Sequence, residues 1–168
     1  MIPLKLGIST CPNDTFIYEN LIQGLANSPF SWEVTYADVQ TLNEMVLRGE
    51  LDVAKVSCGV LPLVEKNYKV LSSGGAIGYG CGPLLLSSET DVINPNQITQ
   101  LPGKNTTAAL LFRFWYEHEF SGSPLLVSYD FFDQVYKNLC LGCISQGVVI
   151  HEHRFTWKKD HLRLIQDL

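Results

Sequence analysis

The hydrophobic pattern of this chain alternates between short apolar runs, typical of buried strands, and longer runs with apolar residues at helical spacing. The apolar runs predict strands at Leu4–Ser9, Trp32–Tyr36, Asp52–Val56, Lys69–Ser72, Leu84–Ser87, Pro124–Ser128 and Gly147–Ile150. The helical spacing predicts helices at Phe16–Ile22, Leu61–Glu65, Ala108–Phe120 and Phe131–Leu139, and another around Leu42, Met45 and Val46. Because strands and helices alternate, we expect an α/β fold with a parallel-rich sheet that helices cover.

A polar, turn-rich segment interrupts this alternation near the middle of the chain. It covers Ser88–Gln100 and contains an Asn-Pro-Asn turn, so we interpret it as the crossing between two lobes. We therefore assign residues 1–88 to a first α/β lobe and residues 89–168 to a second, with a cleft between them. The final run, Leu162–Leu168, has the pattern of the start of a strand or of a crossing segment. We expect the first lobe to lack its C-terminal return segments.

The composition narrows the class of protein and its partners. The chain has 168 residues, of which 46% are hydrophobic, and its net charge is −5. An acidic surface gains nothing from nucleic acid or an anionic membrane, so we expect neither as a partner. The N-terminus lacks the basic and apolar regions of a signal peptide, and no apolar run is long enough to span a bilayer. Five irregularly spaced cysteines fit reduced thiols, which adds to the prediction of a cytoplasmic protein; its oligomeric state stays open.

Polar residues follow the ends of several predicted strands. The pentapeptide at residues 11–15, Cys-Pro-Asn-Asp-Thr, joins the first strand to a helix and places helix N–H groups beside short polar side chains. Because ligands of open α/β sheets bind at the carboxyl ends of the strands, we expect such residues to line a ligand cleft. They are Asn13, Asp14, Asp38, Ser57, Thr106, Thr107 and His151. The alternative for Asp38 is to cap the helix that follows it.

Three of these residues carry the strongest candidate chemistry. Thr106 and Thr107 open an apolar helix, where two hydroxyls and the helix N–H groups suit a carboxylate or phosphate, although N-capping alone also explains a threonine there. His151 follows an apolar strand; it is either a general base near neutral pH or a surface histidine at a strand-to-loop junction. His153 completes a His-x-His pair, but no further ligand has suitable spacing, so we expect no metal site.

Two other motifs have structural interpretations. Cys140 and Cys143 form a lone CxxC that follows a predicted helix, whereas redox thiols precede one, so we expect them to be packing cysteines. The glycine-rich stretch at residues 73–83 leads into a strand and lacks the Lys-Ser/Thr of a phosphate loop. We interpret its glycines as permitting tight turns and close approach of the backbone to a ligand or to the other lobe.

Taken together, the motifs resemble the 1,4-dihydroxy-6-naphthoate synthase family of the futalosine route to menaquinone. The resemblance runs in order from Leu6 to Leu168. It rests on Cys11–Phe16, Ala37–Val39 with Leu42 and Asn43, Gly49–Val53 with Lys55 and Ser57, Ser73–Ala76, Gly80–Pro83, Pro102 and Gly103 with Thr106–Ala108, and Val149–Glu152 with Arg154–Thr156.

This resemblance implies a fold like the two-lobed type II periplasmic binding proteins, with the first lobe incomplete in this chain. It also implies a carbon–carbon lyase that converts cyclic dehypoxanthine futalosine to 1,4-dihydroxy-6-naphthoate without a metal or organic cofactor. By motif, His151 would be the general base, and Thr106 and Thr107 would hold the carboxylate of this small-molecule substrate. The residues implied for the first lobe's side of the cleft are Asn13, Asp14, Asp38 and Ser57.

The chain departs from the family pattern in three ways, and other functions stay open. Tyr79 stands where the family often has arginine, Cys58 and Gly59 replace a more aromatic pair, and family members continue past the point that matches Leu168. One alternative is a non-catalytic cytoplasmic binding protein of the same fold. Others are the sibling enzyme chorismate dehydratase and a non-functional gene fragment.

Overall fold

The computed structural model describes residues 1–24 and 29–168, which form two compact units. The first unit is Met1–Ile77 and the second is Gly78–Leu168. The sequence placed this division at residues 88 and 89 instead. The two boundaries differ because the strand at Leu84–Ser87 forms its backbone hydrogen bonds with two strands of the second unit.

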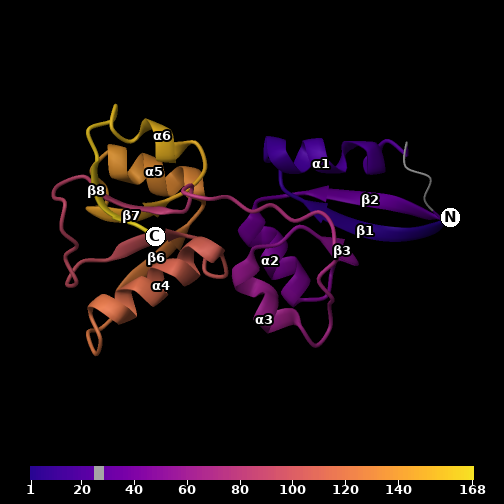
Figure 1. Ribbon diagram of the computed structural model, residues 1–168, viewed down its shortest axis with the longest axis horizontal. Coiled ribbons are helices and arrows are strands. Elements are labelled where there is room, and N and C mark those ends of the chain that lie inside the picture. Colours follow the sequence, from indigo (N-terminus) through magenta and orange to yellow (C-terminus); the bar gives the residue numbers. More distant parts are fainter. Residues whose placement is uncertain (25–28) are drawn as a thin grey trace. The chain divides into compact units, whose positions relative to one another are not determined.

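Three parallel strands form the sheet of the first unit. β1 (Ile2–Ile8) lies between β2 (Phe30–Tyr36) and β3 (Val53–Ala54). The helices of this unit are α1 (Pro12–Ile22), α2 (Val39–Leu47), the short 3₁₀ helix η1 (Cys58–Val60) and α3 (Leu61–Val64). Figure 1 shows α1 on one face of the sheet and α2 and α3 on the other. The carboxyl ends of all three strands therefore share one edge.

The core of the first unit lies beneath α2 and α3. Its buried side chains are Leu42, Val46, Leu51, Val60 and Val64. Gly7 of β1 faces this cluster, since a Cβ at Gly7 would lie 2.5 Å from Leu51 Cδ1 and 2.9 Å from Leu42 Cδ2. Its neighbours Leu6 and Ile8 are fully buried as well. Because successive residues of a strand point to opposite faces, β1 is covered on both faces.

The second unit contains a five-stranded sheet in the order β6–β5–β7–β4–β8. Its strands are β4 (Leu84–Ser87), β5 (Thr99–Pro102), β6 (Val127–Asp130), β7 (Gln146–Val149) and β8 (Arg163–Asp167). β5 is parallel to β6 and β7, whereas β4 is antiparallel to β7 and β8. Its helices are α4 (Thr107–Glu119), α5 (Phe132–Cys140) and α6 (His153–Thr156). In Figure 1, α4 lies on one face of the sheet and α5 and α6 lie on the other.

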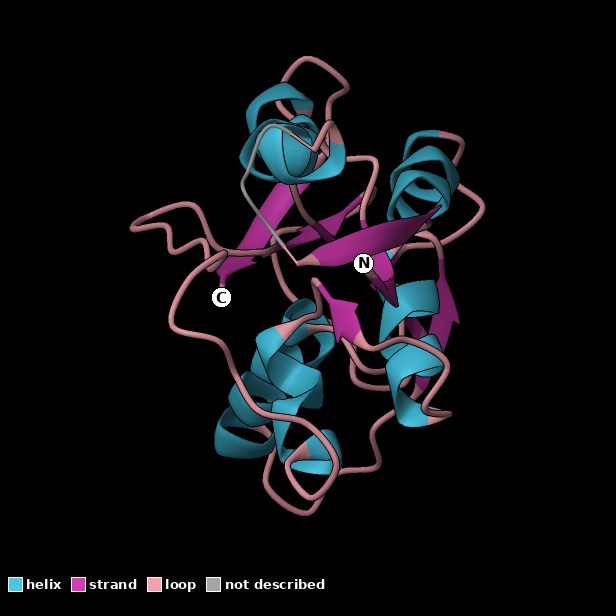
Figure 2. Cartoon of the chain, turned by 90° about the vertical axis from the view of Figure 1, so that its right-hand side faces the viewer, coloured by secondary structure: helices cyan, strands magenta, loops and turns pink. Residues whose placement is uncertain are grey.

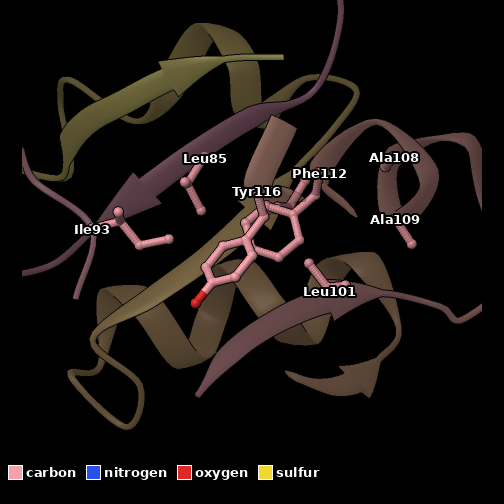
Figure 3. Close-up of a cluster of buried hydrophobic side chains, with 8 residues drawn as sticks. Leu85, Ile93, Leu101, Ala108, Ala109, Phe112 and Tyr116 are labelled. Carbon is pink, nitrogen blue, oxygen red and sulfur yellow. The ribbon is translucent and has the colours of Figure 1, made fainter. Parts of the chain in front are cut away.

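Alternating residues of β4 contribute to two separate cores. The core beneath α4 contains Leu85, Ile93, Leu101, Ala108, Ala109, Phe112, Tyr116 and Val148. Figure 3 shows the side chains of Leu85 and Leu101 turned towards the rings of Phe112 and Tyr116. The core on the α5 side contains Leu84, Leu86, Tyr136, Leu139, Val149 and Leu162. A sheet buried on both faces requires continuously apolar strands, which explains the unbroken leucine run of β4.

Two predicted segments differ from the structure. Lys69–Ser72, predicted as a strand, has no regular structure, and Val70 and Leu71 are 74% and 63% exposed. It belongs to a long segment without helix or strand, residues 65–83 (Figure 2). Ser88–Gln100, interpreted as the crossing between lobes, lies inside the second unit, and its last two residues belong to β5.

The α/β class is confirmed in both units. The sheet of the first unit is parallel as predicted, whereas that of the second is mixed, with two parallel and two antiparallel strand pairs. Across residues 1–24 and 29–168, no helix reaches the length and hydrophobicity that crossing a bilayer requires.

Candidate functional site

Four of the residues that the sequence singled out follow the carboxyl ends of the strands of the first unit. Asn13 and Asp14 follow β1, Asp38 follows β2 and Ser57 follows β3. Because these strands are parallel, the four residues lie at one edge of the sheet. The side chain of Asn13 is exposed there, whereas that of Asp14 is buried.

The buried carboxylate of Asp14 has two partners within the first unit. Ser9 Oγ donates a hydrogen bond to Asp14 Oδ2 at 2.7 Å, and Lys55 Nζ lies 3.3 Å from Asp14 Oδ1. Asp14 also stands in the first turn of α1, where the helix dipole favours a negative charge. Ser9 and Lys55 received no role from the sequence. The available signal was their position directly after β1 and β3.

Tyr18 of α1 lies beside this ion pair. Burial raises the pKa of its phenol, while the charge of Lys55 lowers it and that of Asp14 raises it further. Tyr18 Oη donates to the carbonyl of Gly74 at 3.5 Å. Gly74 has a left-handed φ of 82°, and a Cβ there would lie 2.7 Å from Tyr18 Oη. Glycine is therefore required at this close approach of the backbone to α1.

Asp38 and Ser57 also have structural partners. Asp38 Oδ1 accepts a hydrogen bond from the Gln40 backbone N–H at 2.7 Å. Asp38 therefore caps α2, which is the alternative that the sequence offered for this residue. The fully buried Asn43 accepts from the Ser57 backbone N–H at 2.9 Å and donates from Nδ2 to Ser57 Oγ at 3.1 Å. Asn43, to which the sequence gave no separate role, thus holds Ser57 at the edge of the sheet.

In the second unit, three loops leave the same edge of the sheet. β5, β6 and β7 are parallel neighbours, so the loops after Pro102, Asp130 and Val149 all begin at their carboxyl ends. The first loop carries Thr106 and the third carries His151. The structure therefore brings the expected anion-binding helix terminus and the expected base to one edge of one sheet.

Thr106 is the N-cap of α4. Its Oγ1 accepts from the Ala109 backbone N–H at 3.2 Å and donates to the carbonyl of Gly103 at 3.2 Å, and the residue is buried. The hydroxyl of Thr106 therefore has the N-capping role that the sequence offered as the alternative to anion binding. Thr107 is the first helical residue and is half-buried. Together they fix the first turn of α4, with the positive end of the helix dipole at the edge.

His151 occupies a left-handed turn directly after β7. Its φ is 58°, its side chain is exposed, and its carbonyl accepts from the Arg154 backbone N–H at 3.1 Å. The imidazole packs against Phe132, with ring centroids 5.1 Å apart and planes 70° apart. Left-handed residues other than glycine are uncommon and cluster at functional sites. The sequence predicted a strand end here, but neither the turn nor the aromatic neighbour.

His153 belongs to a different group of side chains. Its ring stacks on Tyr136 with centroids 3.9 Å apart and planes 9° apart, and its Nε2 lies 3.6 Å from Asp133 Oδ1. Asp133, Glu152 and His153 each bring one ligand-type atom within 4.8 Å of the others. The side chain of Asp133 is 58% exposed and Glu152 is exposed, whereas that of His153 is 16% exposed and its buried Nε2 has no hydrogen bond among the described residues.

Cys140 and Cys143 are both exposed, whereas the sequence predicted packing cysteines. Cys140 ends α5, Cys143 follows the next turn, and both residues are exposed. Desolvation of the sulfur raises the pKa of the Cys140 thiol. A raised thiol pKa opposes nucleophilic or redox activity, so the structure offers no activated thiol at Cys140.

Comparison with known sequences identifies a family. A family model described as menaquinone biosynthesis matches residues 4–168. The chain is 38% identical over 165 residues to a 1,4-dihydroxy-6-naphtoate synthase of Streptomyces coelicolor, and 37% identical over 168 residues to one of Thermus thermophilus. These matches cover 98% and 100% of this chain, but 58% and 60% of the relatives. The chain therefore spans somewhat under two thirds of the length of the curated relatives it matches.

Solved structures resemble the chain in fold. A protein of Archaeoglobus fulgidus matches 98% of this chain and 60% of its own, with a TM-score of 0.85 and 23% identity. The alkanesulfonate-binding protein of Xanthomonas axonopodis pv. citri matches 99% of this chain over 61% of its own length, with a TM-score of 0.71 and 13% identity. The periplasmic aliphatic sulphonate binding protein of Escherichia coli matches 99% and 60%, with a TM-score of 0.60 and 12% identity. The predicted likeness to periplasmic binding proteins is confirmed at the level of the fold.

Proposed function

This chain belongs to the menaquinone biosynthesis family, and from that membership we propose that it functions in the 1,4-dihydroxy-6-naphthoate synthase reaction. In this lyase reaction, cyclic dehypoxanthine futalosine is converted to 1,4-dihydroxy-6-naphthoate. The enzyme name of the two curated relatives supports the proposal. The chain spans only part of those relatives, so their reaction is a proposal for this chain.

One observation carries the proposal: the N-terminus of α4 and the turn at His151 share an edge of one sheet. The positive end of the α4 dipole would hold the carboxylate of the substrate, with Thr106 fixing the first turn and Thr107 beside it. His151 is exposed at the same edge and would reach a substrate held there. An anion-binding helix terminus next to a candidate base is the minimum that proton removal from a carboxylate substrate needs.

In the proposed mechanism, His151 removes a proton from the sugar-derived part of the substrate. The carbon–carbon bond then breaks, a three-carbon fragment leaves, and formation of the aromatic naphthoate supplies the driving force. The scheme uses no metal or organic cofactor. For the first unit, we propose substrate contacts at its own sheet edge by Asn13, Asp14, Asp38 and Ser57. We place the reaction in the cytoplasm.

The test is to incubate the purified chain with cyclic dehypoxanthine futalosine and to follow the naphthoate by chromatography. We expect His151→Ala to lower kcat by about 100-fold or more, since a positioned base contributes roughly 10²–10⁴-fold. His161→Ala is the matched control, because His161 is also exposed and also left-handed, with a φ of 59°. Unchanged turnover in His151→Ala would show that His151 is not the general base.

Two results would replace the proposal by an alternative. Binding of the substrate in calorimetry without turnover would indicate a non-catalytic binding protein of this fold. Turnover of chorismate in place of the futalosine derivative would indicate the sibling dehydratase.

A further inference from the structure

Among the described residues, the His151 imidazole has a ring contact with one side chain, Phe132. The left-handed turn fixes the direction of the Cα–Cβ bond of His151, but it leaves the two side-chain torsions undetermined. Within residues 1–24 and 29–168, the imidazole has no hydrogen bond and no ion pair. Its one ring contact is with Phe132, the first residue of α5. A histidine base is usually oriented by a hydrogen-bonded carboxylate or carbonyl, and here an aromatic ring stands in that place.

Phe132 also contacts a second imidazole, that of His153. Its ring centroid lies 6.1 Å from that of His153, and His153 stacks on the buried Tyr136 at 3.9 Å. The phenol of Tyr136 is fixed in turn by hydrogen bonds to Thr156 and Asp160. The rings of His151, Phe132, His153 and Tyr136 therefore form a continuous series from the exposed imidazole to the core of the second unit.

A second histidine of the same unit offers a comparison without the Phe132 contact. His161 has almost the same backbone conformation as His151, with φ of 59° against 58°, and both are exposed. In the described part of the chain, His161 makes no ring contact. The two histidines therefore share a backbone conformation and an exposed position, and among the described residues the ring contact with Phe132 distinguishes His151 from His161.

We propose that Phe132 is a positioning residue that orients the His151 imidazole for proton removal. This inference rests on the proposed function, in which His151 is the base. A ring of fixed orientation restricts the rotation of the imidazole without neutralising it or adding a competing hydrogen bond. Misplacement of a base by about 1 Å costs on the order of 100-fold in rate, so an unoriented imidazole loses turnover more than substrate affinity.

The kinetic test uses three substitutions in the chain. Phe132→Leu keeps an apolar side chain but removes the ring, and we expect kcat to fall by about 10- to 100-fold with KM within about two-fold of the original. Phe132→Tyr keeps the ring and should retain kcat within about three-fold. Phe114→Leu is the control for a phenylalanine lost from a helix, since Phe114 is 66% exposed on α4. An unchanged kcat in Phe132→Leu, or an equal loss in Phe132→Tyr, overturns the proposal.

A second measurement separates this inference from the proposed function. Carbon-13 relaxation of the labelled histidine rings reports the mobility of each imidazole without any substrate, and His151→Gln assigns the resonance. We expect the His151 ring to be more ordered than that of His161, and to become as mobile as His161 in Phe132→Leu. Equal mobility of the two rings in the original chain overturns the inference. If the rings behave as expected but no turnover occurs, the orienting role stands and the proposed reaction fails.

Discussion

The phenol of Tyr136 donates a hydrogen bond to the carboxylate of Asp160. Because the single phenol proton is used in this bond, the hydroxyl of Thr156, 2.8 Å away, donates to the phenol oxygen. Tyr136 is buried in the core on the α5 side of the second unit. Burial raises the pKa of Tyr136 to about 12, and the hydrogen bond to Asp160 contributes in the same direction.

This raised pKa predicts a loss of stability at alkaline pH. The pKa of Tyr136 rises from the ordinary 10.0 to about 12 in the folded state, so between these values the folded chain keeps a proton that the unfolded chain has lost. The stabilisation is fully present below pH 10 and disappears as the pH rises through the folded pKa. The free energy of unfolding should therefore fall by about 1.4 kcal/mol per pH unit in this window from Tyr136 alone.

The measurement is urea unfolding, followed by circular dichroism, at several pH values between 9 and 12. Tyr136→Phe is the comparison that isolates this residue from the other six tyrosines. We expect the slope of stability against pH to be smaller in Tyr136→Phe than in the original chain. Identical slopes would show that Tyr136 does not titrate differently in the two states.

Arg154 links the turn at His151 to β8 and to the segment that precedes β4, and its guanidinium geometry should matter more than its charge. It donates to the carbonyl of Gly82 at 2.7 Å and to both carboxylate oxygens of Asp167 at 2.8 and 2.5 Å. The guanidinium also lowers the pKa of Asp167. Lysine keeps the charge but not the two parallel bonds. We therefore expect Arg154→Lys to destabilise the second unit by about 1–2 kcal/mol, allowing for the half-exposed carboxylate.

Amide hydrogen exchange in β4 and β8 measures this loss where it occurs. Arg163→Lys is the control, because Arg163 is exposed on β8 and has no side-chain partner in the described part of the chain. The lowered pKa of Asp167 adds a pH dependence: its stabilisation is present above the ordinary pKa of 3.8 and is lost as the pH falls through the folded value. Equal exchange rates in the two lysine variants would show that the bidentate geometry contributes nothing.

Strands with local, continuous signals could be predicted from the sequence. The leucine run of β4 is apolar on both faces because α4 and α5 cover both, and a short, continuous apolar run is the local pattern that predicts a buried strand. Lys69–Ser72 carries a similar short signal, yet it is not a strand. Strand formation depends on a neighbouring strand, and the information on pairing is not local. The pairing of β4 is not local either, because its partners β7 and β8 lie far along the chain. The sequence pattern alone therefore places β4 in the first lobe, with the residues that precede it.

In the candidate site, too, the features that depend on local sequence could be predicted and the contacts between distant residues could not. The positions of Thr106 and His151 at strand ends follow from local patterns, and parallel pairing then brings them to one edge. The contact of Lys55 with Asp14 and that of Phe132 with His151 join residues on different elements. Such contacts depend on the register of strands and on the start of a helix, which a single sequence does not specify.

The buried Asn43 allows a test of whether Ser57 is part of a substrate site or only of the fold. Asn43 is 0% exposed and forms two hydrogen bonds with Ser57, at 2.9 and 3.1 Å. Asn43→Ala leaves the Ser57 backbone N–H without this acceptor, which should cost about 1–3 kcal/mol of stability. Ser57→Ala removes only the hydroxyl and leaves the bond from the backbone N–H in place.

The two substitutions should separate in substrate titrations. If Ser57 Oγ contacts the substrate, Ser57→Ala raises the Kd for cyclic dehypoxanthine futalosine about 3- to 10-fold, the equivalent of one neutral hydrogen bond. The free energy of unfolding should fall less in Ser57→Ala than in Asn43→Ala. Asn20→Ala, a change of an exposed asparagine of α1, is the control for both measurements. An unchanged Kd in Ser57→Ala would leave Ser57 with a structural role alone, as the N-cap of η1 held by Asn43.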